Sequence, residues 1–352
     1  TLKMRLSQLF DTKFDTPPNL SFEDSDLEEI EKQAKKVKQN ICLETKKNSR
    51  NQTEYFIKYD EKEDFVLPLF PLNIPEFAKN LLNSSIAVFG GSKSGKTVFT
   101  SYLIYCLMYL FKSDNIGLVI VARTLNSYEK LKNMSDLLSA KMGFSIDFTN
   151  VLCVNDPSLL EQLYYAIYEK KVKDILKKGA DGLDPNFKDP KVAELPDSCK
   201  ETLAQFKYFI FYFDDCTDIY CDPTFKSFFN KFPTTHRHAN VTVVFNTHSF
   251  QHMNVNLRQN INNFAIAGLA SDRVIKLIYE SIHLVGVVFQ KPSRLTKLLF
   301  NKEKFFKNDK TLLIIREPKK NAPQRAVYHY CMDTVFVDKL IDLETKAANE
   351  IN

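Results

Sequence analysis

The chain has 352 residues and a formal net charge of +5, with 44% hydrophobic and 26% charged residues. This size and balance allow one large buried core with smaller appended pieces, as in an ordinary soluble protein. No apolar run reaches the ~18 residues that a membrane-spanning helix requires, so we expect no membrane-spanning segment. Seven cysteines are scattered without a C-x-x-C spacing, which argues against a disulfide framework or a zinc ribbon and favours reduced thiols inside a cell.

Residues 1–67 are expected to form an N-terminal appendage with helical character. A charged amphipathic helix is predicted over 27–37, because acidic residues precede it and lysines close it, as the helix dipole favours. The polar stretch 46–53 predicts a loop. Three prolines between residues 68 and 75 then mark the approach to the first core strand.

A glycine-rich stretch joins an expected strand at 86–89 to an expected helix at 98–111. This helix is apolar on nearly every side, which predicts that it is buried. Gly90 and, after four further residues, the run Gly95-Lys96-Thr97 match the Walker A pattern G-x-x-x-x-G-K-[ST]. Because strand, loop and helix follow in the order that the motif requires, a chance glycine-rich turn is the weaker interpretation.

The Walker A pattern has a definite chemistry. Its glycines let the backbone curl so that successive amides point at phosphate oxygens, and the helix that follows presents its positive end. The Lys96 ammonium can reach the β- and γ-phosphates, and the Thr97 hydroxyl can be a ligand of Mg²⁺. We therefore predict that ATP, the substrate, binds here together with Mg²⁺. The predicted nucleotide-binding residues are Gly90, Gly91, Ser92, Lys93, Ser94, Gly95, Lys96 and Thr97.

Further apolar runs alternate with helical stretches along the chain. Strands are expected at 117–122, 151–154, 208–213, 241–245 and 263–267, and a helix at 158–178. This alternation predicts an α/β fold, a P-loop NTPase with a mostly parallel central sheet flanked by helices. Residues 179–200 are rich in Gly, Pro and Asp, which predicts a surface insertion.

Two adjacent acidic residues follow the expected strand at 208–213 and resemble a Walker B motif. Asp214 is the predicted Mg²⁺ ligand, together with Thr97. Asp215 is predicted to polarise the attacking water. Neighbouring residues of a strand point to opposite sides, so the two acids can take different roles. The second acid favours an enzyme that hydrolyses its nucleotide to drive motion over a small-molecule kinase or a switch GTPase.

Beyond the core, we expect a C-terminal extension that contains a β-hairpin at 311–315 and 326–330. The segment 291–325 holds eleven Lys and Arg residues against three acidic ones, a local net charge of +8. Such a segment suits contact with the phosphate backbone of DNA, and a solvated lysine-rich surface is the equally weighted alternative. The expected domains are an appendage at 1–67, a P-loop ATPase core at 68–285 and a C-terminal extension at 286–352.

The order of these motifs resembles that of the FtsK–HerA superfamily of DNA-pumping ATPases. The likeness rests on the Walker A motif, the paired acids, an arginine ahead of the next strand, polar residues where that strand ends, and the run Leu257-Arg-Gln-Asn260. Within the superfamily, Pro71-Leu-Asn-Ile-Pro75, Phe213-Asp-Asp215 and Arg237-His238 resemble the genome-packaging ATPases of poxviruses and other nucleo-cytoplasmic large DNA viruses. The resemblance covers residues 68–285.

The resemblance implies roles for further residues. Arg237 stands where the superfamily places an arginine that reaches the γ-phosphate bound by a neighbouring subunit. Arg258 is either an alternative finger or a packing residue. His248 falls where the family usually has a glutamine that senses the γ-phosphate, and Asn246 is a neighbouring amide that could replace it. The expected catalytic residues are therefore Lys96, Asp215, Arg237 and His248.

The resemblance also implies a Mg²⁺-dependent ATPase that assembles as a homo-oligomeric ring of about five or six subunits. Such a ring would translocate double-stranded DNA and package a viral genome into capsids. Capsid or portal proteins are the implied partners, and the host cytoplasm (the viral factory) or the virion is the implied location. The alternatives are a helicase or conjugation-type DNA motor, a non-motor regulatory NTPase, and a nucleotide kinase, against which the paired acids argue.

Overall fold

The computed structural model describes residues 42–47, 53–58, 66–71, 74–122, 126–154, 157–176, 195–248, 250–267, 272–283, 311–315 and 327–331. The chain divides into two compact units, which we treat separately. The first unit is drawn from Thr1–Glu76, Phe89–Lys96 and Asn262–Asp342. The second unit is drawn from Phe77–Val88, Thr97–Ile261 and Leu343–Asn352. Among the described residues, no helix combines the length and the apolar character needed to cross a bilayer.

The second unit contains a parallel sheet whose strands lie in the order β4-β8-β7-β5-β6. Strand β7 pairs in parallel with both β5 and β8, and β5 pairs in parallel with β6. The last two residues of β4 belong to the first unit. The bounds are β4 (Ser85–Gly90), β5 (Ile116–Ala122), β6 (Leu152–Val154), β7 (Tyr208–Asp214) and β8 (Val241–Thr247). The predicted mostly parallel α/β architecture is confirmed.

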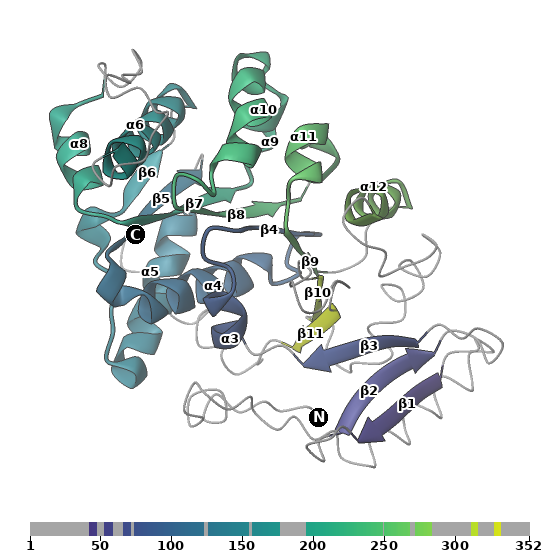
Figure 1. Cartoon of the computed structure of the whole chain (residues 1–352). Helices are drawn as coiled ribbons and strands as arrows, with labels where there is room; N and C mark the ends of the chain where they lie inside the picture. Colours follow the sequence, from purple (N-terminus) through teal and green to yellow (C-terminus); the bar gives the residue numbers. More distant parts are fainter. Residues whose placement is uncertain are drawn as a thin grey trace, which may run out of the picture. The chain divides into compact units, whose positions relative to one another are not determined.

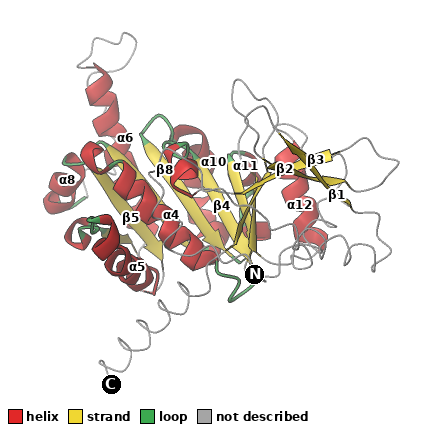
Figure 2. Ribbon diagram, turned by 90° about the horizontal axis from the view of Figure 1, so that it is seen from below, coloured by secondary structure: helices red, strands yellow, loops and turns green. Residues whose placement is uncertain are grey.

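Helices cover both faces of this sheet. In Figure 1, α6, α8 and α10 lie above the strands and α4 and α5 lie below them, and in Figure 2, seen from below, α4 and α5 lie in front of the strands. The helices are α4 (Lys96–Leu110), α5 (Asn126–Met142), α6 (Pro157–Leu176), α8 (Asp197–Ala204), α9 (Thr217–Cys221), α10 (Lys226–Thr235) and α11 (Val255–Gln259). Four 3-10 turns are η1 (Lys112–Asp114), η2 (Phe148–Asn150), η3 (Pro223–Phe225) and η4 (Phe250–His252).

The core of the second unit explains why its strands read as continuous apolar runs. Strands β7 and β8 are buried along nearly their whole length, as expected for central parallel strands with helices on both sides. Aromatic rings fill the space between β7 and the helices above it. The Phe213 ring meets Phe232 of α10 edge to face at 5.9 Å, and Phe211 stacks on Phe232 at 6.0 Å. Helix α4 is buried through most of its turns, as predicted.

The first unit contains strands in the order β1-β2-β3-β11-β10-β9. Strands β10 and β11 form the predicted late hairpin, with Thr311 opposite Cys331. Strand β11 pairs in parallel with β3, and β10 pairs antiparallel with β9. The bounds are β1 (Cys42–Lys47), β2 (Thr53–Lys58), β3 (Val66–Pro71), β9 (Asn263–Ala267), β10 (Thr311–Ile315) and β11 (Val327–Cys331), with helix α12 (Asp272–His283). Helix α3 (Ile74–Lys79) belongs partly to each unit.

Two expectations are refined by the structure. The surface insertion predicted at 179–200 contains regular structure at its end, because residues 197–200 form the first half of α8. Proline and acidic residues also suit a helix start, and α8 begins directly after Pro196 with Asp197 in its first turn. The loop predicted at 46–53 is too long, since both of its ends belong to the antiparallel pair β1–β2. The predicted helix at 27–37 lies outside the described residues, and the domain boundaries at 67/68 and 285/286 stay predictions.

Candidate nucleotide-binding site

The P-loop lies between the end of β4 and the start of α4, as the Walker A motif predicts. At Gly90, φ is +155°, and an added Cβ would lie 1.7 Å from the Ala267 carbonyl oxygen. Only glycine therefore fits this position. Gly95 has φ +86°, which also favours glycine. By contrast, a Cβ at Gly91 would meet nothing within 4 Å. The backbone conformation of the loop thus accounts for two of its three glycines, Gly90 and Gly95.

Side chains of the loop fold back onto one carbonyl. The Ser94 hydroxyl and the Lys96 ammonium both donate to the Gly91 carbonyl oxygen, at 2.8 and 2.7 Å. Lys96 is only 5% exposed. The lysine charge is therefore held at the loop, where phosphate-binding chemistry requires it, and the two bonds keep the loop curled.

The hydroxyl that closes the motif lies in a group of polar side chains in the second unit. Thr97 Oγ1 accepts a hydrogen bond from Asn246 Nδ2 at 3.3 Å, and the same amide donates to Asp214 Oδ1 at 2.5 Å. The register explains this meeting, because Asp214 and Asn246 are paired at the carboxyl ends of two parallel strands. Thr97 and Asp214, the predicted Mg²⁺ ligands, are thus joined by a single amide group.

Asp214 is held by donors on both carboxylate oxygens. Asn246 donates to Oδ1, and the Ser127 hydroxyl, in the first turn of α5, donates to Oδ2. Burial raises the pKa of Asp214, while hydrogen bonds from Ser127, Tyr212 and Asn246 act to lower it. A cation next to the carboxylate would offset this cost of burial.

The residues present fit a magnesium ion. A hydroxyl and a carboxylate are the hard oxygen donors that Mg²⁺ prefers, with water completing its coordination. The side-chain oxygen of Asn246, which is 3% exposed, is buried with no hydrogen-bond partner among the described residues. An acceptor therefore remains beside Asp214 for a donor such as a metal-bound water.

Asp215 differs from its neighbour in both backbone and exposure. Its φ is +49°, a left-handed conformation that Asp tolerates better than most residues, and its side chain is exposed. Its backbone amide donates to the Asn246 carbonyl oxygen at 2.8 Å. The chain thus turns sharply where β7 ends. Asp214 therefore lies among the polar side chains of Thr97, Ser127 and Asn246, and Asp215 lies at the surface.

The three remaining predicted residues occupy different surroundings. Arg237 is exposed in the turn between α10 and β8, and its guanidinium makes no hydrogen bond or ion pair within the described part of the chain. Arg258 Nη1 donates to the carbonyl oxygens of Gln251 and Met253, at 3.2 and 2.5 Å. These contacts suit the packing role, which is one of the two roles left open for Arg258. His248 is exposed, one residue beyond the end of β8.

Three residues of the polar group were not predicted. Ser127 lies just beyond β5, whose last residue pairs with Asp214. Tyr212 is one of two tyrosines in the apolar run of β7, and Thr100 lies one turn beyond Thr97 on α4. The available signal was weak, because it consisted of polar residues near the ends or in the middle of apolar elements.

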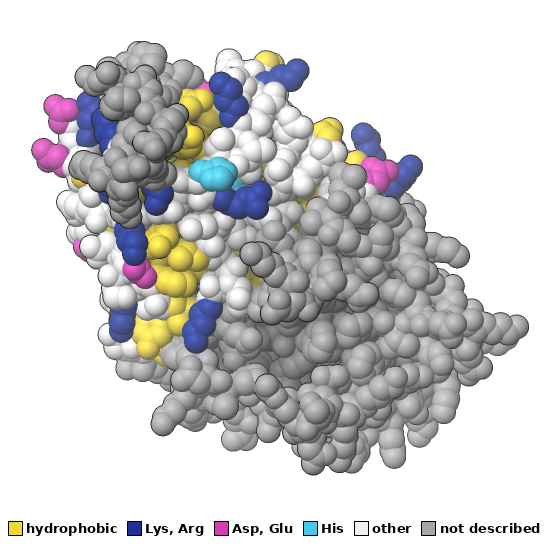
Figure 3. Space-filling model, viewed as in Figure 1, with side chains coloured by type: hydrophobic (Ala, Val, Ile, Leu, Met, Phe, Trp, Pro, Cys, Tyr) yellow, Lys and Arg dark blue, Asp and Glu magenta, His cyan; other side chains and the backbone are white. Residues whose placement is uncertain are grey.

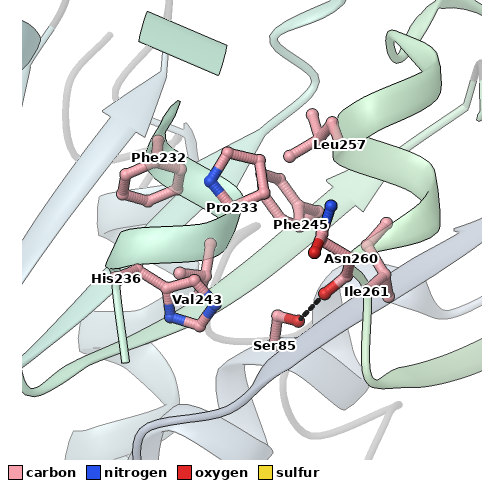
Figure 4. A pocket seen from close by; sticks show the side chains of 9 residues that line it. All are labelled: Ser85, Phe232, Pro233, His236, Val243, Phe245, Leu257, Asn260 and Ile261. Carbon is pink, nitrogen blue, oxygen red and sulfur yellow. Dashed lines mark hydrogen bonds between the residues drawn. The ribbon is translucent and has the colours of Figure 1, made fainter. Parts of the chain in front are cut away.

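A small pocket lies beside the turn that carries Arg237. It is lined by residues of α10, α11, β4 and β8 and of the turns beside them (Figure 4). The His236 ring is 1% exposed, and its Nδ1 lies 2.8 Å from the Val241 carbonyl oxygen. Its Nε2, on the ring edge turned toward Ser85, has no hydrogen-bond partner among the described residues. Burial lowers the pKa of His236 to about 4.

This histidine predicts a pH-dependent stability. Its folded-state pKa lies below the unfolded value of about 6.5, so the unfolded chain binds the extra proton. The contribution of neutral His236 to the free energy of unfolding, at most about 3 kcal/mol, is complete above pH 6.5 and is lost as pH falls toward 4. Denaturant unfolding between pH 4.5 and 7.5 measures it. His236→Asn should flatten the dependence, while His238→Asn, at an exposed site on the same turn, should retain it. Parallel curves for wild type and His236→Asn would contradict the assignment.

The fold is that of a P-loop α/β protein, with a loop of the Walker A sequence pattern between β4 and α4. No family model matches the chain, and no curated protein matches its sequence. Among solved structures, it is similar to EssC (ATPases 2 and 3) from Geobacillus thermodenitrificans, at 12% identity and a TM-score of 0.40. That match covers 68% of this chain but only 39% of the EssC chain.

Two viral proteins are similar to the chain at the same level. B204, the DNA-packaging ATPase from Sulfolobus turreted icosahedral virus, is 12% identical, with a TM-score of 0.40 over 72% of this chain and 99% of that one. The genome packaging NTPase B204 from Sulfolobus turreted icosahedral virus 2, in complex with AMPPCP, is 14% identical. It has a TM-score of 0.39 over 71% of this chain and 98% of its own.

Proposed function

We propose that this chain is a Mg²⁺-dependent ATPase that translocates double-stranded DNA, and that it packages a viral genome into capsids. One observation carries the proposal: Thr97, which ends the Walker A pattern, and Asp214 both accept a hydrogen bond from the side-chain amide of Asn246. This is the donor set that an ATP-bound magnesium ion requires. The packaging role rests on the order of motifs along residues 68–285.

Each residue of the site has a proposed role. The loop amides and Lys96 bind the phosphates, and Thr97 and Asp214 would hold the metal, which supplies positive charge to the phosphate oxygens. Asp215 orients and polarises the attacking water. Arg237 reaches the γ-phosphate of a neighbouring subunit in a homo-oligomeric ring of about five or six copies. We assign the sensing of the γ-phosphate to His248, and Asn246, which contacts both proposed metal ligands, is the alternative.

DNA contact is proposed for the basic segment 291–325, most of which lies outside the described residues. Lys and Arg side chains on the face seen in Figure 3 are spread over the described surface and do not gather in one patch. A motor must move over any sequence, so its contacts should be with phosphates. We expect capsid or portal proteins as partners, and the viral factory or the virion as the location.

The test is the ATPase rate measured against duplex DNA at several salt concentrations. We expect DNA to stimulate turnover, and the stimulation to fall steeply as salt rises, because binding releases about 0.9 counterions for each phosphate contact. Lys96→Ala serves as the control for contaminating ATPases, since it removes the charge that the loop holds. Turnover indifferent to DNA and to protein concentration would instead identify a regulatory NTPase, and strand displacement would identify a helicase.

A further inference from the structure

The most unusual side chain beneath the site is Tyr212. It lies in β7 between Phe211 and Phe213, and it is 0% exposed. A buried hydroxyl without a partner costs about 1–3 kcal/mol, so an apolar residue would suit this position better on packing grounds alone. The hydroxyl is nevertheless fully engaged. Its oxygen lies 3.2 Å from Thr100 Oγ1 and accepts from Asn246 Nδ2 at 3.4 Å.

These contacts close a ring of hydrogen bonds that joins α4 to β7 and β8. Thr100 Oγ1 also bonds the Thr97 carbonyl oxygen at 3.0 Å, and Asn246 returns to the Thr97 hydroxyl. Thr100, Tyr212 and Asn246 are all buried. Both predicted magnesium ligands therefore touch this ring, Thr97 through two of its atoms and Asp214 through the Asn246 amide.

We propose that Tyr212 is a positioning residue for the metal site: its hydroxyl fixes Asn246 and Asp214 relative to Thr97, so that both ligands are in place before the cation binds. The inference rests on the proposed nucleotide function and names the residue that prepares its metal subsite. Magnesium demands nearly octahedral oxygens at short distances, so a carboxylate free to rotate binds it poorly. Loss of such an outer-shell partner typically costs about 10- to 100-fold in metal affinity.

The experiment uses the full-length Tyr212→Phe variant and a non-hydrolysable fluorescent ATP analogue. The affinity of the variant and of the wild type for this analogue is measured first in EDTA and then during a titration with MgCl₂. We expect affinity in EDTA to stay within about twofold of wild type, because no loop contact is changed. The Mg²⁺ concentration at the midpoint should rise about tenfold. Thr100→Val should act in the same direction, and the double variant should add little, because both substitutions break one network.

Tyr105→Phe is the matched control. Tyr105 is also a buried tyrosine, it lies on α4, and its hydroxyl donates to the Phe144 carbonyl oxygen at 2.8 Å, away from the metal ligands. Its variant should lose a comparable hydrogen bond and leave the Mg²⁺ midpoint unchanged.

Several results would overturn the positioning role. They are a wild-type midpoint in folded Tyr212→Phe, equal shifts in the Tyr105→Phe control, or an equal loss of affinity in EDTA. If Tyr212→Phe does not fold, Thr100→Val decides by the same criteria. Failure of the wild-type chain to bind the analogue at all would reject the proposed function instead, so the two failures are distinguishable.

Discussion

Asp215→Asn is expected to reduce ATP hydrolysis by about 10²- to 10⁴-fold while leaving ATP bound. The substitution removes the carboxylate that polarises water but preserves the shape of the site. Asn tolerates the left-handed backbone found here, at φ +49°, and the backbone amide that bonds Asn246 is unchanged. Single-turnover hydrolysis and filter binding of labelled ATP, measured on the same preparation, separate loss of chemistry from loss of binding.

Two comparisons make this result specific. Asp136→Asn changes an exposed acid on α5 and should leave turnover at the wild-type rate. Asp214→Asn should instead weaken binding in the presence of Mg²⁺, because it removes a charged metal ligand. Unchanged turnover in Asp215→Asn would reject this residue as the base and leave Asp214 as the only functional acid of the pair.

Arg237→Ala is expected to lower ATPase activity by about 10³-fold or more and to inhibit wild-type subunits in mixed assemblies. The guanidinium is exposed and makes no hydrogen bond or ion pair with the described residues, so the variant should be as stable as the wild type. Mixing the two proteins at several ratios measures the effect. If Arg237 acts on a neighbour's nucleotide, activity should fall below the line expected for simple dilution.

Arg258→Ala provides the contrast within the same unit. Because Arg258 donates to two carbonyl oxygens near η4, its removal should lower the free energy of unfolding by about 1–3 kcal/mol. It should not inhibit wild-type subunits. Strict linear dilution by Arg237→Ala would reject the arginine finger, and inhibition by folded Arg258→Ala would transfer the role to Arg258.

The sequence is most informative where chemistry and local structure coincide. The P-loop and the paired acids can be placed because each follows an apolar run that forms a buried parallel strand. The strand β1 was missed because it is largely polar, with Glu44 and two lysines, and shows no alternating pattern. Helix α10 was missed because Pro233 stands inside it, and proline usually predicts a helix break.

The composition of the polar group depends on register, which a single sequence does not reveal. Asn246 lies near the end of β8 and His248 lies one residue beyond it, two positions further along the chain, so alternation alone does not choose between them. The pairing of Asp214 with Asn246 makes that choice for the described contacts. The contact of Ser127 with Asp214 is equally hard to predict from the sequence. It depends on the pairing of β5 with β7, which places the end of β5, and the start of α5 after it, beside Asp214.

The first glycine of the loop determines how P-loop variants should be chosen. Because the Ala267 carbonyl oxygen occupies the space where a methyl group at residue 90 would go, Gly90→Ala would force two backbones apart. A loss of activity in that variant could then result from the displaced backbone as well as from weaker phosphate binding. Gly91 has room for a methyl group, so mutagenesis there interrogates ligand recognition in an undisturbed framework.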